Sequence, residues 1–370
     1  MRQTTSILLI MMIFLAGCGG NITPPAKEKQ VVKIGASLAL SGDLAFFGET
    51  VKNSMELAVK DLKDSKYDYQ LVFEDDKLDP KTASTAATKL IQVDNVDAII
   101  SWSSGTGNAV APIAQENKVI HFNPVASDAN VAKGFYNFIH WTQPNQEAMA
   151  WADEASKRDI KRIAIIVMQH QGLQAISDAV KNFSESEGMT VVNTETFAPG
   201  EKDFRSSIMK IKASNPDIIF IGALDPELPL IYTQMKELGV KTPVSCAESF
   251  ELTKDPSLFN GQWYASASDP TVGFTAKYKA AYGKDPQISA PNAYDVVNLI
   301  VAGYEKAGKD SAVKPTHEEV ANEILKIKDF DGAVGRIDVG EEGIVRSKAS
   351  IKMIIDGKPV TQTYKASPGP

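Results

Sequence analysis

Cysteine is scarce in this sequence: the chain of 370 residues contains only 2, Cys18 and Cys246. So few cysteines exclude the disulfide-rich scaffolds of small secreted domains, and a body of this length buries enough apolar surface to be stable without disulfides. Excess positive charge is also lacking, because 46 acidic residues outnumber 39 lysines and arginines and leave a formal net charge of -7. No basic stripe is present, so we expect no nucleic-acid partner.

Recognisable catalytic and metal-binding motifs are missing as well. Neither a Gly-x-Ser-x-Gly nucleophile elbow nor a Walker phosphate loop occurs. No two of the 4 histidines stand at metal-ligand spacing: His121, His140, His170 and His317. The sequence therefore provides no specific reason to propose an enzyme, a metal site or a cofactor.

Long apolar runs are lacking after Leu15, and the run before it is short. Arg2 precedes an unbroken apolar stretch from Ile7 to Leu15, and small residues follow. A positive start, a short apolar core and a small-residue cleavage site are typical of a secretory signal peptide. A membrane span would need roughly 20 apolar residues. We therefore interpret residues 1–17 as a signal peptide and expect the protein to be exported.

The segment Leu15-Ala16-Gly17-Cys18 resembles the bacterial lipobox, in which the cysteine becomes the lipid-modified first residue of the mature protein. The resemblance implies lipidation at Cys18 and a membrane-anchored protein that faces the periplasm or the cell exterior. Residues 18–30 contain paired glycines and paired prolines and are predicted to form a tether outside the fold. A plain signal peptide with an accidental cysteine is the alternative.

Beyond the tether, short apolar segments alternate with amphipathic ones. The pattern predicts strands at 31–40, 69–73, 96–101, 119–123, 163–168, 190–197, 217–222 and 243–246. It predicts helices at 51–62, 81–93, 108–115, 146–157, 173–186, 204–213 and 226–238. This alternation implies parallel sheets covered by helices on both faces.

The same pattern indicates two domains. It restarts after Pro144, and a body of about 350 residues is too long for one ordinary core. The C-terminal part departs from the alternation, with helices expected at 272–282, 292–307 and 316–327 and strands at 337–339 and 349–355. We therefore expect two lobes between which the chain crosses more than once.

The stretch from Ser101 to Asn108 is the richest in candidate binding groups. It places Ser104 among small residues between a predicted buried strand and a predicted helix. Small residues allow a ligand to approach the backbone, and the first N–H groups of a helix attract a carboxylate or phosphate. Gly105-x-Gly107 also resembles the start of a dinucleotide fingerprint, but Val110 stands where its third glycine belongs. An N-cap without a ligand is the other alternative.

Two further strand ends carry candidate groups. The segment from Phe122 to Asp128 would lie beside the Ser104 stretch in a parallel sheet, at the edge where such folds bind ligands. Within it, Val125 offers its backbone and Ser127 a hydroxyl. In the second unit, Glu248 follows a predicted strand and could face an ammonium group across a cleft. A solvated loop glutamate is the alternative for this residue.

Taken in order, these segments resemble the bacterial leucine/isoleucine/valine-binding protein family, the type I periplasmic solute-binding proteins of ABC importers. The resemblance extends from about Val31 to the last strands. Its landmarks are Ile34–Gly42, Gly48, Asp75–Pro80, the Ser104 stretch, Asn123–Ser127, Gly200–Phe204 and Asp338–Gly343. It implies an α/β fold of two lobes, each a mainly parallel sheet flanked by helices, joined by multiple crossovers.

The resemblance also implies roles for individual residues. Ser104 and the backbone near Val125 are expected to bind a ligand carboxylate, and Ser127 is expected to contact both the carboxylate and the amine. Glu248 is expected to receive the ammonium group from the other lobe. Phe47 is expected to close over the ligand side chain.

Two departures from the family leave the ligand open. Gly172 and Leu224 stand where the family has aromatic residues. Their small or aliphatic side chains make the cleft roomier and more apolar, or allow His170 and Gln171 to supply polar contacts. Leucine is therefore not assumed to be the ligand.

We expect lobe 1 to comprise residues 31–143 plus about 272–350, and lobe 2 residues 144–271 plus about 351–366. The expected function is binding of a small amino acid or a similar solute for the permease membrane subunits of an ABC importer. A ligand-sensing receptor for an amide, a urea-like compound or an aromatic acid is one alternative. An enzyme on this scaffold is the other.

Overall fold

The computed structural model describes residues 29–346 and 349–362. The predicted signal peptide, Cys18 and nearly all of the tether lie outside the described residues. Among the residues that the structure describes, no helix has both the length and the apolar character that a membrane crossing requires.

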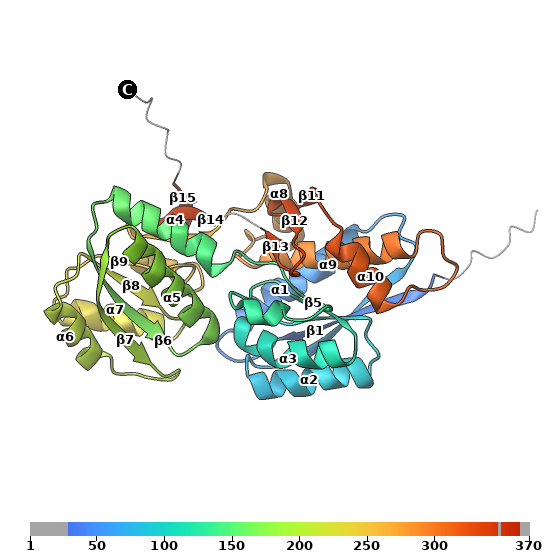
Figure 1. The fold of residues 1–370 in the computed structure, drawn as a ribbon, viewed down its shortest axis with the longest axis horizontal. Helices are drawn as coiled ribbons and strands as arrows, with labels where there is room; N and C mark the ends of the chain where they lie inside the picture. Colours follow the sequence, from blue (N-terminus) through green and yellow to red (C-terminus); the bar gives the residue numbers. More distant parts are fainter. Residues whose placement is uncertain (1–28, 347–348, 363–370) are drawn as a thin grey trace, which may run out of the picture.

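The first lobe is built on a five-stranded parallel sheet with the strand order β2-β1-β3-β4-β5. Its strands are β1 (Val31–Leu38), β2 (Asp68–Asp75), β3 (Ala98–Ile100), β4 (Ile120–Asn123) and β5 (Asn137–Ile139). One face is covered by α2 (Pro80–Gln92) and α3 (Ser104–Glu116), and the other by α1 (Ala45–Asp61) and α9 (Ala290–Ala307) (Figure 1). Helix α10 (His317–Leu325) packs on α9.

The second lobe repeats this plan with a four-stranded parallel sheet in the order β7-β6-β8-β9. Its strands are β6 (Arg162–Met168), β7 (Thr190–Phe197), β8 (Ile218–Gly222) and β9 (Val244–Ser245). Its helices are α4 (Pro144–Lys157), α5 (Gln171–Ser186), α6 (Arg205–Ala213) and α7 (Glu227–Glu237). An antiparallel sheet of β10 (Trp263–Ala267), β14 (Ala349–Ile355) and β15 (Lys358–Thr361) adjoins β9 through a bridge between Ala247 and Ala265.

The chain passes between the lobes after β5, after β10 and after β13, and Figure 1 shows the two lobes side by side. The segment that follows the second passage contains α8 (Val272–Tyr282) and a small antiparallel sheet of β11 (Phe330–Gly332), β12 (Gly335–Val339) and β13 (Val345–Arg346). The sequence-based expectation of a two-lobed α/β fold with parallel sheets is confirmed. The division of the chain into residues 31–143 plus about 272–350 and residues 144–271 plus about 351–366 stays a prediction.

Helix α3 begins four residues earlier than the apolar spacing predicts, at Ser104 instead of Asn108. Ser103 is its N-cap, with a positive φ of 75° and a side-chain oxygen that accepts the Thr106 N–H at 3.4 Å. The small residues after Ser103 carry no apolar signal, so the pattern missed the first turn. The Ser104 stretch is therefore mostly helix, and Ser104 lies in its first turn.

The glycine in α1, Gly48, has a packing reason. A Cβ at Gly48 would lie 1.9 Å from the carbonyl oxygen of Ala39, so only glycine lets the helix approach the end of β1 this closely. This contact starts α1 at Ala45, ahead of the predicted residue 51.

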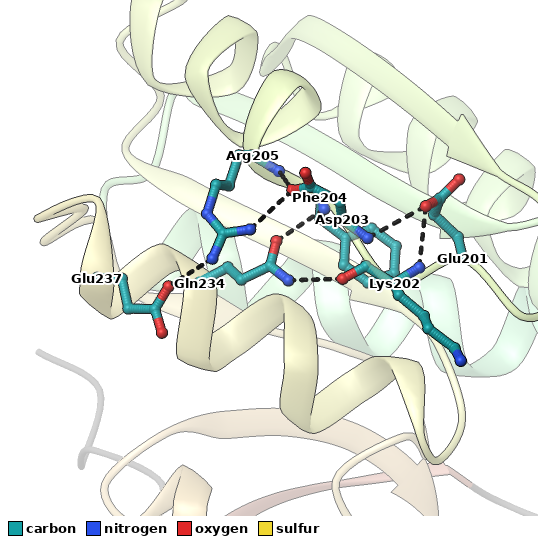
Figure 2. Close-up of polar contacts among 7 residues, drawn as sticks. All are labelled: Glu201, Lys202, Asp203, Phe204, Arg205, Gln234 and Glu237. Carbon is teal, nitrogen blue, oxygen red and sulfur yellow. Dashed lines mark hydrogen bonds and ion pairs between the residues drawn. The ribbon is translucent and has the colours of Figure 1, made fainter.

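The Gly200–Phe204 landmark forms the approach to α6, and Figure 2 shows how its backbone is held. Gln234 on α7 accepts the Phe204 N–H at 2.7 Å and donates to the Lys202 carbonyl at 2.8 Å. Glu201 accepts the N–H groups of Lys202 and Asp203 at 2.9 and 3.1 Å. This landmark therefore joins α6 to α7 within the second lobe.

Candidate functional site

Residues of both lobes line a small cavity of about 40 Å³. Six of the seven ligand-site residues expected from the sequence lie on it: Ser104, Val125, Ser127, Gly172, Leu224 and Glu248. The remaining lining residues are Trp102, Ser103, His170, Leu173, Ile176 and Leu252. The cavity lies where the carboxyl ends of the central strands of both lobes meet, which is the usual ligand position in open α/β sheets.

Ser104 organises the wall of the cavity in the first lobe. Its hydroxyl oxygen accepts the backbone N–H groups of Ser127 at 3.0 Å and of Asp128 at 3.2 Å. Because both bonds use the oxygen as acceptor, the hydroxyl hydrogen remains available to donate to a ligand oxygen. The first-turn N–H groups of α3 add partial positive charge at the same place. This wall suits a carboxylate or another group with acceptor oxygens.

Asn123, at the end of β4, holds the two strand ends of this wall together. Its side-chain oxygen accepts the Val125 N–H at 2.9 Å, and its amide nitrogen donates to the Ser103 carbonyl and the Ser101 hydroxyl, both at 2.8 Å. The Val125 N–H is therefore satisfied within the protein.

Trp102 is a site residue that the sequence reasoning did not select. Its side chain is 3 % exposed and lines the cavity, and its indole N–H has no hydrogen-bond partner among the described residues. A buried donor without a partner costs about 1–3 kcal/mol, so a ligand acceptor at this point would be favourable. In the sequence, only its position within the Ser101–Asn108 stretch could have identified Trp102 as a site residue.

The structure places Phe47 behind the wall and not on it. The Phe47 ring is fully buried and stacks on the Trp102 ring, with centroids 5.2 Å apart. Phe47 contacts the ring of Trp102 and is absent from the lining of the cavity, so its expected role over the ligand side chain stays a prediction.

Glu248 supplies the acidic group of the wall in the second lobe. It follows β9 with a positive φ of 64°, its N–H donates to the Ala265 carbonyl at 2.9 Å, and its carboxyl accepts the Trp141 indole N–H. Burial raises the pKa of Glu248 to about 7, against the lowering effect of hydrogen bonds with Glu147 and Trp141. The carboxyl therefore titrates close to neutral pH while the cavity holds no ligand.

The family model described as "Periplasmic binding protein" matches residues 31–351. The chain belongs to the periplasmic binding protein family. The Leu/Ile/Val-binding protein BraC3 of Rhizobium johnstonii is 27% identical over 334 residues, which cover 86% of this chain and 90% of the relative. BraC3 is a binding protein, and this chain is a periplasmic solute-binding protein of the same type, not an enzyme.

Solved structures agree with the fold. The leucine-binding protein LivK of Thermotoga maritima matches with a TM-score of 0.81 and 25% identity, covering 90% of this chain and 98% of that one. A solute-binding protein of an R. palustris ABC transporter, solved with 4-hydroxybenzoate, matches with a TM-score of 0.82 and 21% identity over 90% of this chain and 96% of that one.

The lobes of this periplasmic binding protein touch beside the cavity. Asn108 on α3 donates to the Gln171 side chain at the start of α5 at 2.7 Å. On the same side, the Lys254 ammonium lies 3.4 Å from the Asp43 carboxylate. The polar contact that His170 and Gln171 were expected to supply is thus made in part to the other lobe.

A larger cleft of about 610 Å³ adjoins the small cavity. The two spaces share the lining residues Ser103, His170 and Leu224. Apolar residues of both lobes contribute to its lining, including Leu44, Leu78, Pro80, Met168 and Pro226. His170 stands between the two spaces. Burial lowers the pKa of His170, so its ring is neutral at neutral pH, and its Nδ1 has no partner among the described residues.

Proposed function

We propose that this protein is the extracytoplasmic solute-binding component of an ABC importer and binds a small amino acid or a similar solute between its lobes. The observation that carries this proposal is the convergence of Ser104, Ser127 and Glu248 on one small cavity from opposite lobes. A donor wall and an acidic wall that face each other match the two ends of a zwitterion.

The binding mode follows from these walls. The ligand carboxylate accepts from the Ser104 hydroxyl, from Ser127 and from the start of α3, and the Trp102 indole N–H is a further donor. The ligand ammonium donates to Glu248, a charge-assisted contact of about 1.5–3 kcal/mol. The aliphatic side chains of Leu173, Ile176 and Leu252 border the remaining space. Their apolar character suits an aliphatic ligand group.

Closure of the lobes completes the site. Because Ser104 and Glu248 belong to different lobes, a ligand that contacts both binds the closed form more tightly than the open form. Such differential binding shifts the population toward the closed form. Closed lobes then form the surface that the permease subunits recognise.

A sensor of an aromatic acid is the second candidate function. The apolar outer cleft of about 610 Å³, which Leu224 lines, favours it. The R. palustris protein solved with 4-hydroxybenzoate shows that this fold accommodates such a ligand.

The location of the site relative to the membrane is part of the proposal. A lipid on Cys18 would hold the binding module at a membrane surface, within reach of a permease. Mass spectrometry of the protein purified from membranes tests this, because lipidation adds acyl chains to a mature chain that begins at Cys18. An unmodified N-terminus elsewhere would contradict it.

Thermal unfolding with a panel of the twenty amino acids, benzoate, 4-hydroxybenzoate, urea and acetamide tests the ligand class. A compound that binds only the folded state raises the melting temperature. At least one amino acid is expected to do so, and Glu248→Ala is expected to abolish that shift while the protein remains folded. A shift with benzoate compounds alone would favour the second candidate.

A further inference from the structure

His140 and Trp141 are two fully buried residues in the first passage between the lobes, between β5 and α4. They are neighbours in the chain, but their side chains bond to opposite lobes. The His140 ring nitrogen Nε2 lies 3.3 Å from a carboxyl oxygen of Asp295 on α9, in the first lobe. The Trp141 indole N–H donates to Glu248, which lines the ligand cavity from the second lobe. This passage therefore connects the ligand site to a buried carboxyl of the first lobe.

Asp295 also holds the second passage between the lobes. Its carboxyl accepts the Ala333 N–H at 2.6 Å and the Val334 N–H at 3.3 Å, in the turn between β11 and β12. The Ala333 carbonyl accepts the N–H of Thr271, the last residue of the second passage, at 2.7 Å. A Cβ at Gly332 would lie 2.6 Å from Asp295 Oδ2, so a glycine is what lets this turn approach the carboxyl. One buried carboxyl thus anchors both the first and the second passage.

The first lobe holds His140 by its backbone as well as by its ring. The His140 N–H donates to the Asn123 carbonyl at 2.9 Å, and its carbonyl accepts the Asn292 side-chain amide at 2.9 Å. The ring donates through Nε2 to Asp295, because the oxygens of that carboxyl already act as acceptors. All four residues are buried, so water does not compete for these bonds. The position of His140 is thereby fixed relative to β4 and α9.

Neighbouring residues that are bonded to opposite lobes restrict the motion of those lobes. A rotation of one lobe against the other requires the loss of the Trp141–Glu248 bond, the loss of the His140–Asp295 bond, or a change in the torsions between them. In the arrangement seen here both bonds are present, and the lobes touch. The Glu248 carboxyl is therefore held by the passage in the same arrangement in which the walls of the cavity meet.

We propose that Asp295, His140 and Trp141 are positioning residues that present the Glu248 carboxyl to the ligand when the lobes close. Asp295 fixes His140, His140 carries Trp141 as its neighbour in the chain, and the Trp141 indole orients Glu248. The three residues do not line the ligand cavity, so we expect their effect on a ligand to pass through Glu248. The inference rests on the proposed function, because it states how the acidic wall of that same site is set.

The ligand-free protein tests the connection through its indole N–H groups. The chain has 4 tryptophans, and NMR hydrogen exchange follows each labelled indole. In Asp295→Asn the side-chain NH2 faces at least one of the three N–H donors that the carboxyl accepts, so the passage loosens. The Trp141 indole N–H is expected to exchange at least about tenfold faster in this variant. The Trp151 indole N–H, which donates to Ser245 at 2.8 Å inside the second lobe, is expected to keep its rate.

Asp97→Asn is the matched control for this substitution. Asp97 is also a buried aspartate of the first lobe, accepts the Lys33 N–H at 2.8 Å and pairs with Lys314 at 2.6 Å. It precedes β3, at the end of the sheet opposite to the one where the chain leaves β5. Asp97→Asn is expected to leave both indole rates unchanged. No acceleration at Trp141 in Asp295→Asn, or an equal acceleration at Trp141 and Trp151, would overturn the proposal.

Calorimetry with each of the twenty amino acids tests the effect on binding. Trp141→Phe is expected to weaken the binding of the amino acids that bind the wild type by about 5- to 30-fold, because Glu248 loses its donor. Trp151→Phe, at an equally buried indole, is expected to leave this affinity unchanged. Asp295→Asn is expected to weaken binding about fivefold or more.

The double variant separates a positioning role from a merely structural one. If Asp295 acts through Trp141, adding Asp295→Asn to Trp141→Phe weakens binding by no more than about twofold further. Effects that multiply in the double variant would show that Asp295 acts independently and would overturn the inference while leaving the proposed function intact. If none of the twenty amino acids binds the wild type, the proposed function fails, and the indole exchange of the ligand-free protein still decides the inference.

Discussion

The hydroxyl oxygen of Ser104 lies 2.8 Å from the point that a Cβ at Gly172 would occupy. These two residues belong to different lobes, so the absence of a side chain at Gly172 is what lets α3 and α5 approach each other beside the ligand cavity. An aromatic residue at position 172 would not fit in this arrangement of the lobes. How closely the two lobes approach therefore depends on the size of the side chain at position 172.

Gly172→Ala is expected to weaken ligand binding at least tenfold without unfolding the protein. The added methyl group displaces the Ser104 hydroxyl, which already accepts two backbone N–H groups, or holds the lobes apart. Calorimetry with the amino acid found in the thermal panel measures the affinity, and small-angle scattering measures closure. Gly273→Ala on α8 is the control, because a Cβ there meets no atom within 4 Å. Equal affinities in the two variants would contradict this explanation.

Trp102 is expected to report ligand binding through its fluorescence. Its indole N–H is buried without a partner beside the ligand space, so a bound carboxylate changes its surroundings. Trp102→Phe is expected to lose this signal and to bind about 5- to 30-fold more weakly, as a lost hydrogen bond of about 1–2 kcal/mol requires. Trp151→Phe should retain the ligand response, because the Trp151 indole donates to Ser245 at 2.8 Å inside the second lobe. Because the Trp141 indole N–H donates to Glu248 and also responds to a ligand there, unchanged ligand affinity in Trp102→Phe is the result that would refute the assignment.

The stability of the ligand-free protein is expected to decrease as the pH rises toward neutral because of Glu248. Its pKa rises from 4.5 to about 7 on folding, so the folded protein binds this proton more tightly than the unfolded chain does. The favourable contribution is complete below about pH 4.5 and is lost as the pH approaches 7, up to about 3 kcal/mol in total. Urea unfolding of wild type and Glu248→Gln at several pH values measures the difference.

Glu201 is expected to change the stability with pH in the opposite direction to Glu248. The N–H groups of Asp203 and Lys202 lower the pKa of Glu201, so its contribution is present at neutral pH and is lost as the pH falls. The difference between wild type and Glu201→Gln should therefore grow with rising pH. The same trend in both variants would show that neither carboxyl is responsible.

Gln234→Ala is expected to lower the free energy of unfolding by about 1–3 kcal/mol and to leave ligand affinity unchanged. The substitution removes the partners of the Phe204 N–H and the Lys202 carbonyl, which hold the approach to α6 (Figure 2). Chemical unfolding and calorimetry separate the two effects. A matched change at the exposed Glu237, which pairs with Arg205 at 3.0 Å, should cost less than about 1 kcal/mol.

The sequence by itself determined the fold and identified most residues that line the candidate cavity. Long strands such as Val31–Leu38 and Ile218–Gly222 are visible because their apolar residues are consecutive. Ser104, Ser127 and Glu248 come shortly after the shorter strands β3, β4 and β9. Parallel strands bring their carboxyl ends to one edge, so residues at those ends meet without any knowledge of the packing. The pattern of apolar residues barely detects strands as short as Val244–Ser245, and it did not predict β5 or β10.

Tertiary structure alone decided which side chains face the cavity and how they are charged. Trp102 and Phe47 are both aromatic residues near the site, and only their stacking assigns the cavity to Trp102 and the core to Phe47. Glu248 looks like an ordinary loop acid in the sequence, because nothing local shows that its carboxyl is buried against Trp141 from a distant part of the chain. Burial and the distance between charges set the pKa, and both depend on residues far apart in the chain.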